Sequence, residues 1–229
     1  MKYDALKVVT LVDSKNQLQG SESVRFEDAD QNGLRVLFVG NSVTLHAPCE
    51  SIGWYGEWGM AASAKERDYV HLVESFVKKT HPDASFCICN AADWERGYRN
   101  GDETFPIYAA ARAFDANVII IKISGNSPKD GFDGETFKQN YEKLISFLNP
   151  NGSAKIILAT EFFRHPAEDA IVSFAKEKAF PLCILSDISD FDEYKAVGLF
   201  DHVGVAAHPG DKGMQVIAER IMEKLIRMI

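Results

Sequence analysis

From residue 34 to the end of the chain, short apolar runs rich in β-branched residues alternate with longer stretches whose apolar residues recur every three or four positions. The first pattern is typical of buried strands, and the second of amphipathic helices that cover a sheet. The expected strands are 35–39, 84–89, 118–123, 155–159 and 182–185, and the expected helices are 66–79, 105–114, 136–147, 167–178 and 212–228. This alternation predicts an α/β protein, a three-layer α/β/α flavodoxin-like fold with a five-stranded parallel sheet.

Residues 1–33 depart from this pattern. Two short strand-like runs, 8–12 and 23–26, are joined by a polar segment, which predicts a β-hairpin. A length of 229 residues suits one domain with a small addition. We therefore expect a hairpin appendage over 1–33 and the main domain over 34–229.

Charge and composition exclude several classes of function. The net charge is -8, and basic residues are clustered nowhere, which argues against nucleic acid and against an acidic membrane surface as partners. No apolar run approaches the roughly 20 residues of a spanning helix, and the first residues lack a signal-peptide core. The sequence thus predicts a soluble protein, and no pattern indicates an oligomeric state.

The cysteines and histidines do not form a metal-binding pattern. The four cysteines, Cys49, Cys87, Cys89 and Cys183, lie mostly in apolar runs, which indicates buried free thiols and a reducing cytoplasm. The Cys-x-Cys pair has no second pair to complete a zinc site, and the six histidines show no ligand spacing. We expect no metal, no cofactor and a cytoplasmic location.

Residues suited to acyl transfer follow the expected strands. In parallel sheets, ligands bind outside the carboxyl ends of the strands. Ser42 follows the first expected strand, Asn126 follows the third, and His208 comes late in the chain. A nucleophile, an oxyanion donor and a base are the minimum parts for acyl transfer. Taken singly, each has a structural explanation, such as a helix cap for Ser42 or a turn for Asn126.

The order of these residues resembles the sequence blocks of the SGNH/GDSL hydrolases, a family of esterases and lipases. Residues 36–42 (VLFVGNS) are similar to the first block, which implies that Ser42 is the nucleophile, with Asn41 where the family has Asp. Residues 124–127 (SGNS) resemble the third block, which implies that the Asn126 amide is an oxyanion donor. Residues 205–209 (VAAHP) resemble the last block, with His208 as the base. The resemblance covers residue 34 to the C-terminus.

The second block shows one departure. Residues 90–97 are similar to it, but Glu95 occupies the position of the glycine whose backbone N–H helps to bind the oxyanion. Any residue except proline supplies such a donor, so Glu95 remains a candidate catalytic residue. Because its carboxylate would repel an oxyanion, we expect the side chain to point away or to pair with Arg96 or Arg99.

The last block shows a second departure, since Val205 stands where the family has an acid that orients the base. Three acceptors are open to the second ring nitrogen of His208: Glu161, Asp201 and a backbone carbonyl near Val205. We favour the carbonyl, and hence a serine-histidine dyad.

A glycine-rich loop at 53–60 carries Trp54 and Trp58 just after the nucleophile. Two interpretations stay open: these rings stack on a sugar, or they pack the loop against the helix expected from residue 66. Asn41, Trp54 and Trp58 are the candidate substrate-binding residues.

Together these features predict a serine esterase that forms an acyl-enzyme. The expected substrate is a small acyl group such as acetyl, carried on a small molecule or a carbohydrate. One alternative is a non-catalytic carbohydrate- or small-molecule-binding module on a degenerate hydrolase fold, which the loss of the acid at Val205 would favour. Another is a flavin or nucleotide binder, although the chain lacks a glycine-rich phosphate loop after its first strand.

Overall fold

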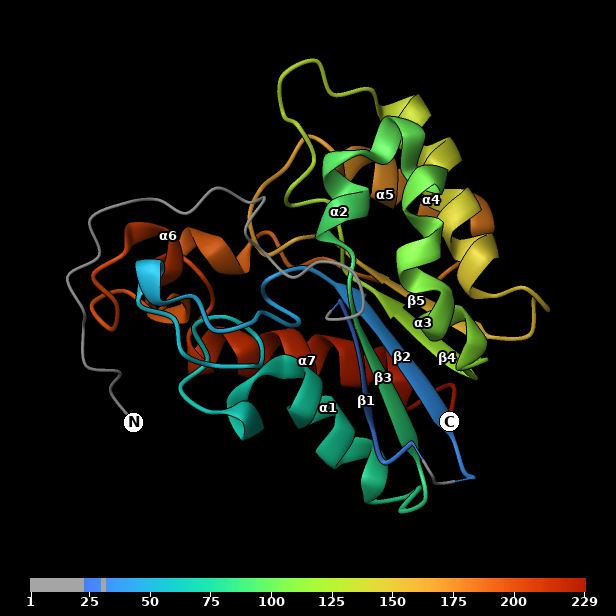
Figure 1. Cartoon of the computed structure of the whole chain (residues 1–229), viewed down its shortest axis with the longest axis horizontal. Helices are drawn as coiled ribbons and strands as arrows, with labels where there is room; N and C mark the ends of the chain where they lie inside the picture. The colour runs from blue at the N-terminus through green and yellow to red at the C-terminus, as the bar shows by residue number, and fades with distance from the viewer. Residues whose placement is uncertain (1–22, 30–31) are drawn as a thin grey trace.

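Six strands form a single sheet in the order β1-β3-β2-β4-β5-β6. Figure 1 labels the first five of these strands in chain order, β1 to β5. The computed structural model describes residues 23–29 and 32–229. Five strands run parallel to one another: β2 (Arg35–Gly40), β3 (Ser85–Asn90), β4 (Val118–Ile121), β5 (Lys155–Ala159) and β6 (Leu182–Cys183). The predicted five-stranded parallel sheet is confirmed, and β1 (Val24–Glu27) adds a sixth strand.

Strand β1 lies antiparallel to β3, with Val24 opposite Cys89 and Glu27 opposite Phe86. It corresponds to the second strand of the hairpin predicted over 1–33. The first strand of that hairpin, at 8–12, lies outside the described residues. Because β1 shares a backbone ladder with β3, this part of the expected appendage is a component of the main sheet.

Helices cover both faces of the sheet (Figure 1). One face carries α1 (Tyr69–Lys78) and α7 (Asp211–Leu225). The other carries α2 (Ala92–Arg96), α3 (Ala109–Ala113), α4 (Gly134–Leu148) and α5 (Glu168–Lys178). The short helix α6 (Val203–Ala206) and the 3-10 turns η3 (Glu50–Ile52), η4 (Lys65–Arg67), η5 (Tyr98–Tyr108), η6 (Ile188–Asp190) and η7 (Asp192–Tyr194) lie in the connections. No helix among the described residues is long and apolar enough to cross a membrane.

The sequence of β2 explains the two cores. Successive side chains of a strand point to opposite faces. Val36 and Phe38 enter the core beneath α1 and α7, whereas Leu37 and Val39 enter the core beneath α2 to α5, and all four are fully buried. A strand that is apolar at every position is therefore stable only with helices on both faces.

Two expected helices have different bounds in the structure. The helix expected from residue 66 begins at Tyr69, because the Asp68 side chain accepts a hydrogen bond from His71 N and caps it. The stretch expected as one helix over 105–114 is divided: residues 105–108 are the end of the 3-10 segment η5, and 109–113 form α3. The cysteines are free as predicted, and Cys87, Cys89 and Cys183 are buried.

Candidate active site

The turn after β2 presents Ser42 at the carboxyl edge of the sheet. The Asn41 carbonyl accepts hydrogen bonds from Thr44 N at 2.8 Å and Leu45 N at 3.0 Å, so the chain reverses sharply around Ser42. Gly40 makes this turn possible, because a Cβ at this position would lie 1.7 Å from Thr44 Oγ1. Ser42 keeps 8% of its surface exposed, so its hydroxyl sits at the rim of the buried core.

Ser42 and His208 are joined by a hydrogen bond. Ser42 Oγ lies 2.9 Å from His208 Nε2, although the two residues are 166 positions apart. The His208 ring packs edge-on against Phe163, with ring centroids 5.5 Å apart. The structure thus brings together the two residues for which the sequence predicted the roles of nucleophile and base.

The second ring nitrogen of His208 contacts a backbone carbonyl. His208 Nδ1 lies 2.6 Å from Gly204 O. Helix α6 begins where the His202 side chain accepts from Val205 N, and its last turn leaves carbonyls without intrahelical donors. His208 Nδ1–H donates to one of them, which leaves Nε2 unprotonated and facing Ser42. The predicted carbonyl acceptor near Val205 is confirmed.

The two alternative acids have other surroundings. Glu161 accepts hydrogen bonds from Asn41 Nδ2 at 2.7 Å and from Lys122 Nζ at 2.8 Å. Asp201 is exposed on the surface.

Burial lowers the pKa of His208 to about 4, against the opposing effect of the Gly204 carbonyl. The imidazole is consequently neutral at neutral pH, as a general base must be.

Glu95 does not occupy the predicted position. It lies inside α2, where its backbone N–H donates to Ala91 O at 3.1 Å, so this N–H is not directed at a substrate. Its side chain is fully buried and pairs with neither expected arginine: Arg96 pairs with Asp93, and Arg99 donates to Gly131 O. The prediction failed because the chain is helical at the position where the family block has a glycine.

The Glu95 carboxyl instead organises the groups around the site. It accepts hydrogen bonds from Ser124 N at 2.5 Å, from Asn126 Nδ2 at 2.5 Å and from Asn41 Nδ2 at 3.0 Å. Burial, together with the nearby Glu161 carboxylate, raises the pKa of Glu95 above its usual range. Glu95 is therefore a candidate for fixing the orientation of Asn126 rather than for supplying a backbone donor.

Asn41 and Lys122 complete a buried polar network beneath Ser42. The Asn41 amide group donates to both Glu95 and Glu161, and its oxygen accepts from Val43 N at 3.3 Å. Lys122 is fully buried and forms an ion pair with Glu161. The prediction that the Asn41 side chain binds substrate is not supported, since its donors are used within the protein. Lys122 was missed, although a lone charge in the apolar run 118–123 marks it.

A cavity of about 230 Å³ opens above this network. Its polar wall includes Ser42, Asn126 and His208, and its apolar wall is formed by Val43, Ile52, Met60, Phe163 and Val205. The other lining residues are Asn41, His46, Gly125, Glu161, His202 and Gly204. A larger hollow of about 760 Å³ over η4 and α7 contains none of the candidate catalytic residues. The smaller cavity is where the predicted nucleophile, the predicted base and the predicted oxyanion donor meet.

Trp54 and Trp58 do not line this cavity. Trp54 is fully buried, and its ring packs against Phe200 at a centroid distance of 6.1 Å. Trp58 packs edge-on against Trp54 at 5.7 Å, and its Nε1 donates to Ala62 O at 3.0 Å. The prediction of sugar stacking is wrong for Trp54, which is fully buried, and the half-buried Trp58 packs on Trp54 outside the cavity. Phe163 is the aromatic residue that lines the cavity, and sequence reasoning missed it.

Comparison with known proteins gives a match only at the level of structure. No protein-family model matches the chain, and no curated protein sequence matches it. A two-domain esterase active on acetylated mannans superposes with a TM-score of 0.57 at 17% identity, over 88% of this chain and 50% of the esterase. A lipolytic protein of the G-D-S-L family from Veillonella parvula superposes with a TM-score of 0.51 at 11% identity, over 85% of this chain and 99% of that protein.

The fold is that of the SGNH/GDSL hydrolases. A family two carbohydrate esterase from Clostridium thermocellum, solved in complex with cellohexaose, gives a TM-score of 0.52 at 14% identity over 85% of this chain and 64% of the esterase. The chain thus spans about half to two thirds of the length of these carbohydrate esterases. The SGNH resemblance predicted from four short blocks is confirmed for the fold.

Proposed function

We propose that this protein is a serine esterase that hydrolyses a carboxylic ester through an acyl-enzyme, with Ser42 and His208 as a catalytic dyad. The observation that carries the proposal is one chain of contacts: Ser42 Oγ lies 2.9 Å from His208 Nε2, and His208 Nδ1 lies 2.6 Å from Gly204 O. A nucleophile held by a base, which is itself oriented by a third group, is the arrangement that acyl transfer requires.

In the proposed reaction, Ser42 Oγ attacks the ester carbonyl while His208 Nε2 takes the hydroxyl proton. The Gly204 carbonyl keeps Nδ1 protonated throughout and stabilises the imidazolium that forms. His208 then returns its proton to the leaving alcohol. In the second half, His208 activates a water molecule that hydrolyses the acyl-serine, and the serine hydroxyl is restored.

The oxyanion is bound, in this proposal, by the Ser42 backbone N–H and the Asn126 side-chain amide. Within residues 23–29 and 32–229, the Ser42 N–H donates to no other group, and Asn126 lies in the wall of the same cavity. Glu95 accepts from Asn126 and so holds the amide in place. The raised pKa of Glu95 favours its neutral form, which reduces its repulsion of a developing negative charge.

A small acyl group such as acetyl suits the cavity. The cavity has a volume of about 230 Å³, which lies below the ~300–1,000 Å³ of common ligand pockets. The apolar side chains of Ile52, Met60 and Phe163 offer a surface for a methyl group. A carbohydrate as the alcohol part is supported by the two structural neighbours described as an esterase active on acetylated mannans and a carbohydrate esterase bound to cellohexaose.

Hydrolysis of p-nitrophenyl acetate by the purified full-length chain tests the proposal. We expect turnover that disappears in Ser42→Ala, and a mass increase of one acetyl group on wild type after rapid acid quench. Rates should fall from the acetyl to the butyryl and octanoyl esters because the cavity is small. Turnover that persists in folded Ser42→Ala contradicts the proposal. A protein without turnover that still binds sugars supports the binding-module alternative instead.

A further inference from the structure

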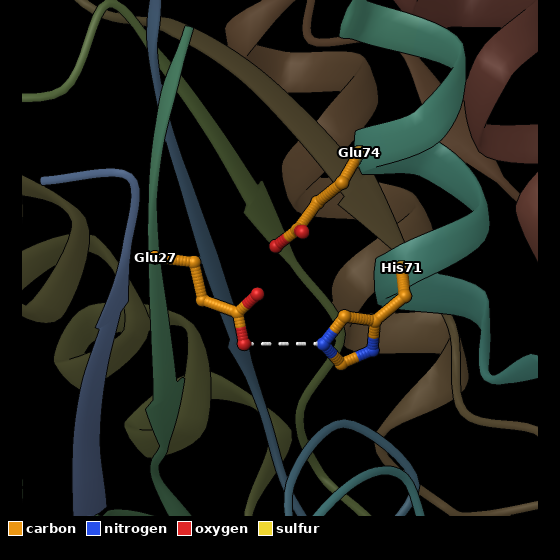
Figure 2. Close-up of side chains that lie close together, drawn as sticks. All are labelled: Glu27, His71 and Glu74. Atoms are coloured by element: carbon orange, nitrogen blue, oxygen red, sulfur yellow. Dashed lines mark hydrogen bonds and ion pairs between the residues drawn. The ribbon is translucent and has the colours of Figure 1, made fainter. Parts of the chain in front are cut away.

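A second cluster of polar side chains lies between β1 and α1, away from the candidate active site. Glu27 comes from β1, and His71 and Glu74 come from α1. One ligand atom from each of the three lies within 4.8 Å of the other two. Figure 2 shows the three side chains pointing into one space between the strand and the helix. None of them lines the cavity that holds Ser42.

The Glu74 side chain is buried in this space, and one of its oxygens has no hydrogen-bond partner among the described residues. Only 4% of the surface of Glu74 is exposed, and the oxygen in question is Oε1. Its carboxyl group faces Glu27 and His71 (Figure 2). Burying an uncompensated carboxylate costs several kcal/mol, so a group of this kind is normally paired or bound to a cation.

Asp68 orients the imidazole of His71 toward the same space. Asp68 Oδ1 lies 2.7 Å from His71 Nδ1, and the carboxylate is itself fixed because it caps α1 and accepts from Gly59 N at 2.9 Å. His71 Nε2 is therefore the ring nitrogen that faces Glu27. A carboxylate that holds Nδ1 while Nε2 faces other ligands is the usual second shell of a metal-binding histidine.

We propose that Glu27, His71 and Glu74 bind a divalent transition-metal ion such as Zn²⁺, through His71 Nε2 and one oxygen of each carboxylate. Zinc ligands at ~2.1 Å in a tetrahedron lie about 3.4 Å apart. His71 Nε2 and Glu27 Oε1 are 3.3 Å apart, so this pair already has the required spacing. The imidazole ligand favours zinc-like ions over Mg²⁺ or Ca²⁺, which prefer oxygen alone.

Lys65 is the competing cation at this site. Its Nζ lies 2.6 Å from Glu27 Oε1, and 45% of its side chain is exposed. An exposed lysine can move to the second Glu27 oxygen or to water when the ion binds. With three protein ligands, the fourth position of the ion is left for water. The ion joins an edge strand of four residues to the helix that covers it, and its role is therefore structural.

Calorimetric titration of the full-length chain with ZnCl₂, after treatment with a chelator and its removal, tests the site. We expect one ion per chain and a higher thermal unfolding midpoint in the presence of zinc. Glu27→Gln and Glu74→Gln should each weaken binding by at least the roughly ten- to hundredfold that loss of an outer-shell partner costs, since each removes the negative charge of a direct ligand. Glu103→Gln, an exposed glutamate on η5, is the matched control and should bind zinc as wild type does.

The thermal unfolding midpoints of wild type and Glu74→Gln give an independent readout, because their difference should change sign between chelator and zinc. In chelator, Glu74→Gln should unfold at or above the wild-type temperature, because it removes a buried carboxyl group whose pKa burial raises to about 8; in zinc, wild type should be the more stable. His208→Gln should keep zinc binding, which excludes His208 as a ligand. Absence of zinc uptake by wild type, or equal affinities for wild type and Glu74→Gln, overturns the proposal. Turnover of p-nitrophenyl acetate is measured separately and should not depend on the chelator.

Discussion

Two histidines in this molecule differ in charge at neutral pH, since His208 is neutral and His71 is protonated in the metal-free protein. Burial lowers the pKa of His208 to about 4, and the Gly204 carbonyl only partly opposes this effect. Burial also acts to lower the pKa of His71, but hydrogen bonds to the Asp68 and Glu27 carboxylates outweigh it and raise the pKa to about 9. The partner of the ring, rather than its burial, decides the difference.

The comparison explains why a backbone carbonyl suits a base. A carbonyl fixes the tautomer of His208 without a net charge, so the ring stays neutral and able to accept the Ser42 proton. A carboxylate such as Asp68 fixes the ring equally well but also favours its protonated form. The two clusters thus separate two tasks: proton transfer at His208 and, in the metal-free protein, charge pairing at His71, whose Nε2 proton is released when a metal ion binds.

The largest expected effect is a difference in esterase activity between variants of His208 and of His71. His208→Ala should lower kcat for p-nitrophenyl acetate by about four orders of magnitude, since a nucleophile and its base act as one unit. His71→Gln should leave kcat/KM within about twofold when measured on folded protein, because the ring does not line the cavity. Circular dichroism checks folding of both variants, and a comparable loss of kcat in folded His71→Gln contradicts the separation.

Asn126→Ala tests the other side of the active site. We expect kcat to fall by about a hundredfold to a thousandfold with little change in KM, because an oxyanion donor acts where negative charge develops. Glu95→Gln serves as the companion variant: its amide oxygen can still accept from Asn126, so its loss should be smaller. An unchanged kcat in Asn126→Ala removes this residue from the mechanism.

Glu161→Gln asks whether His208 has a carboxylate partner, as His71 does. The change leaves Lys122 buried without an ion-pair partner, so the free energy of unfolding should fall by ~3–5 kcal/mol. The kcat per folded molecule should remain largely intact, since Glu161 contacts Asn41 and Lys122. The exposed Asp201→Asn is the control and should change neither quantity. A loss of kcat as severe as in His208→Ala, in folded protein, establishes a triad.

The smallest expected effect is in the pH profile. Because the pKa of His208 is lowered to about 4, the base stays unprotonated as pH falls from 7 to 5, and kcat/KM should be nearly constant over that range. Protonation below the lowered pKa should then decrease kcat/KM about tenfold per pH unit. His46 and Lys122 lower this pKa and Glu161 raises it, so constant ionic strength is needed. An acid limb near the ordinary histidine pKa contradicts the neutral, carbonyl-held ring.

The parts of the site that follow strand ends could be predicted from the sequence. Ser42, Asn126 and His208 each lie close to an element that periodicity identifies, and parallel strands bring such positions to one edge. The alternation of strands and helices predicted the three α/β/α layers, because periodicity identifies those elements too. The carbonyl partner of His208 followed from the absence of an acid at Val205, which left few acceptors nearby.

The features that the sequence analysis predicted wrongly or missed depend on local conformation or on long-range packing. Spacing placed the Glu95 N–H in the oxyanion site, but this N–H is bonded within α2, and periodicity does not resolve a helix of five residues. Trp54 follows the nucleophile in sequence, yet it packs against Phe200, which is 146 positions later. The cluster of Glu27, His71 and Glu74 joins a strand and a helix whose pairing no local pattern contains.

Strand β1 also bears on how the protein resists aggregation. It is four residues long and carries Arg25 and Glu27, and it covers one edge of β3. Beneath it, β3 is a run of six buried residues, Ser85–Asn90, and an uncovered strand of this kind is a template for pairing with other chains. If a metal ion fastens β1 to α1, chelation loosens this cover, and concentrated metal-free protein should form β-rich aggregates at temperatures where its helices are still intact.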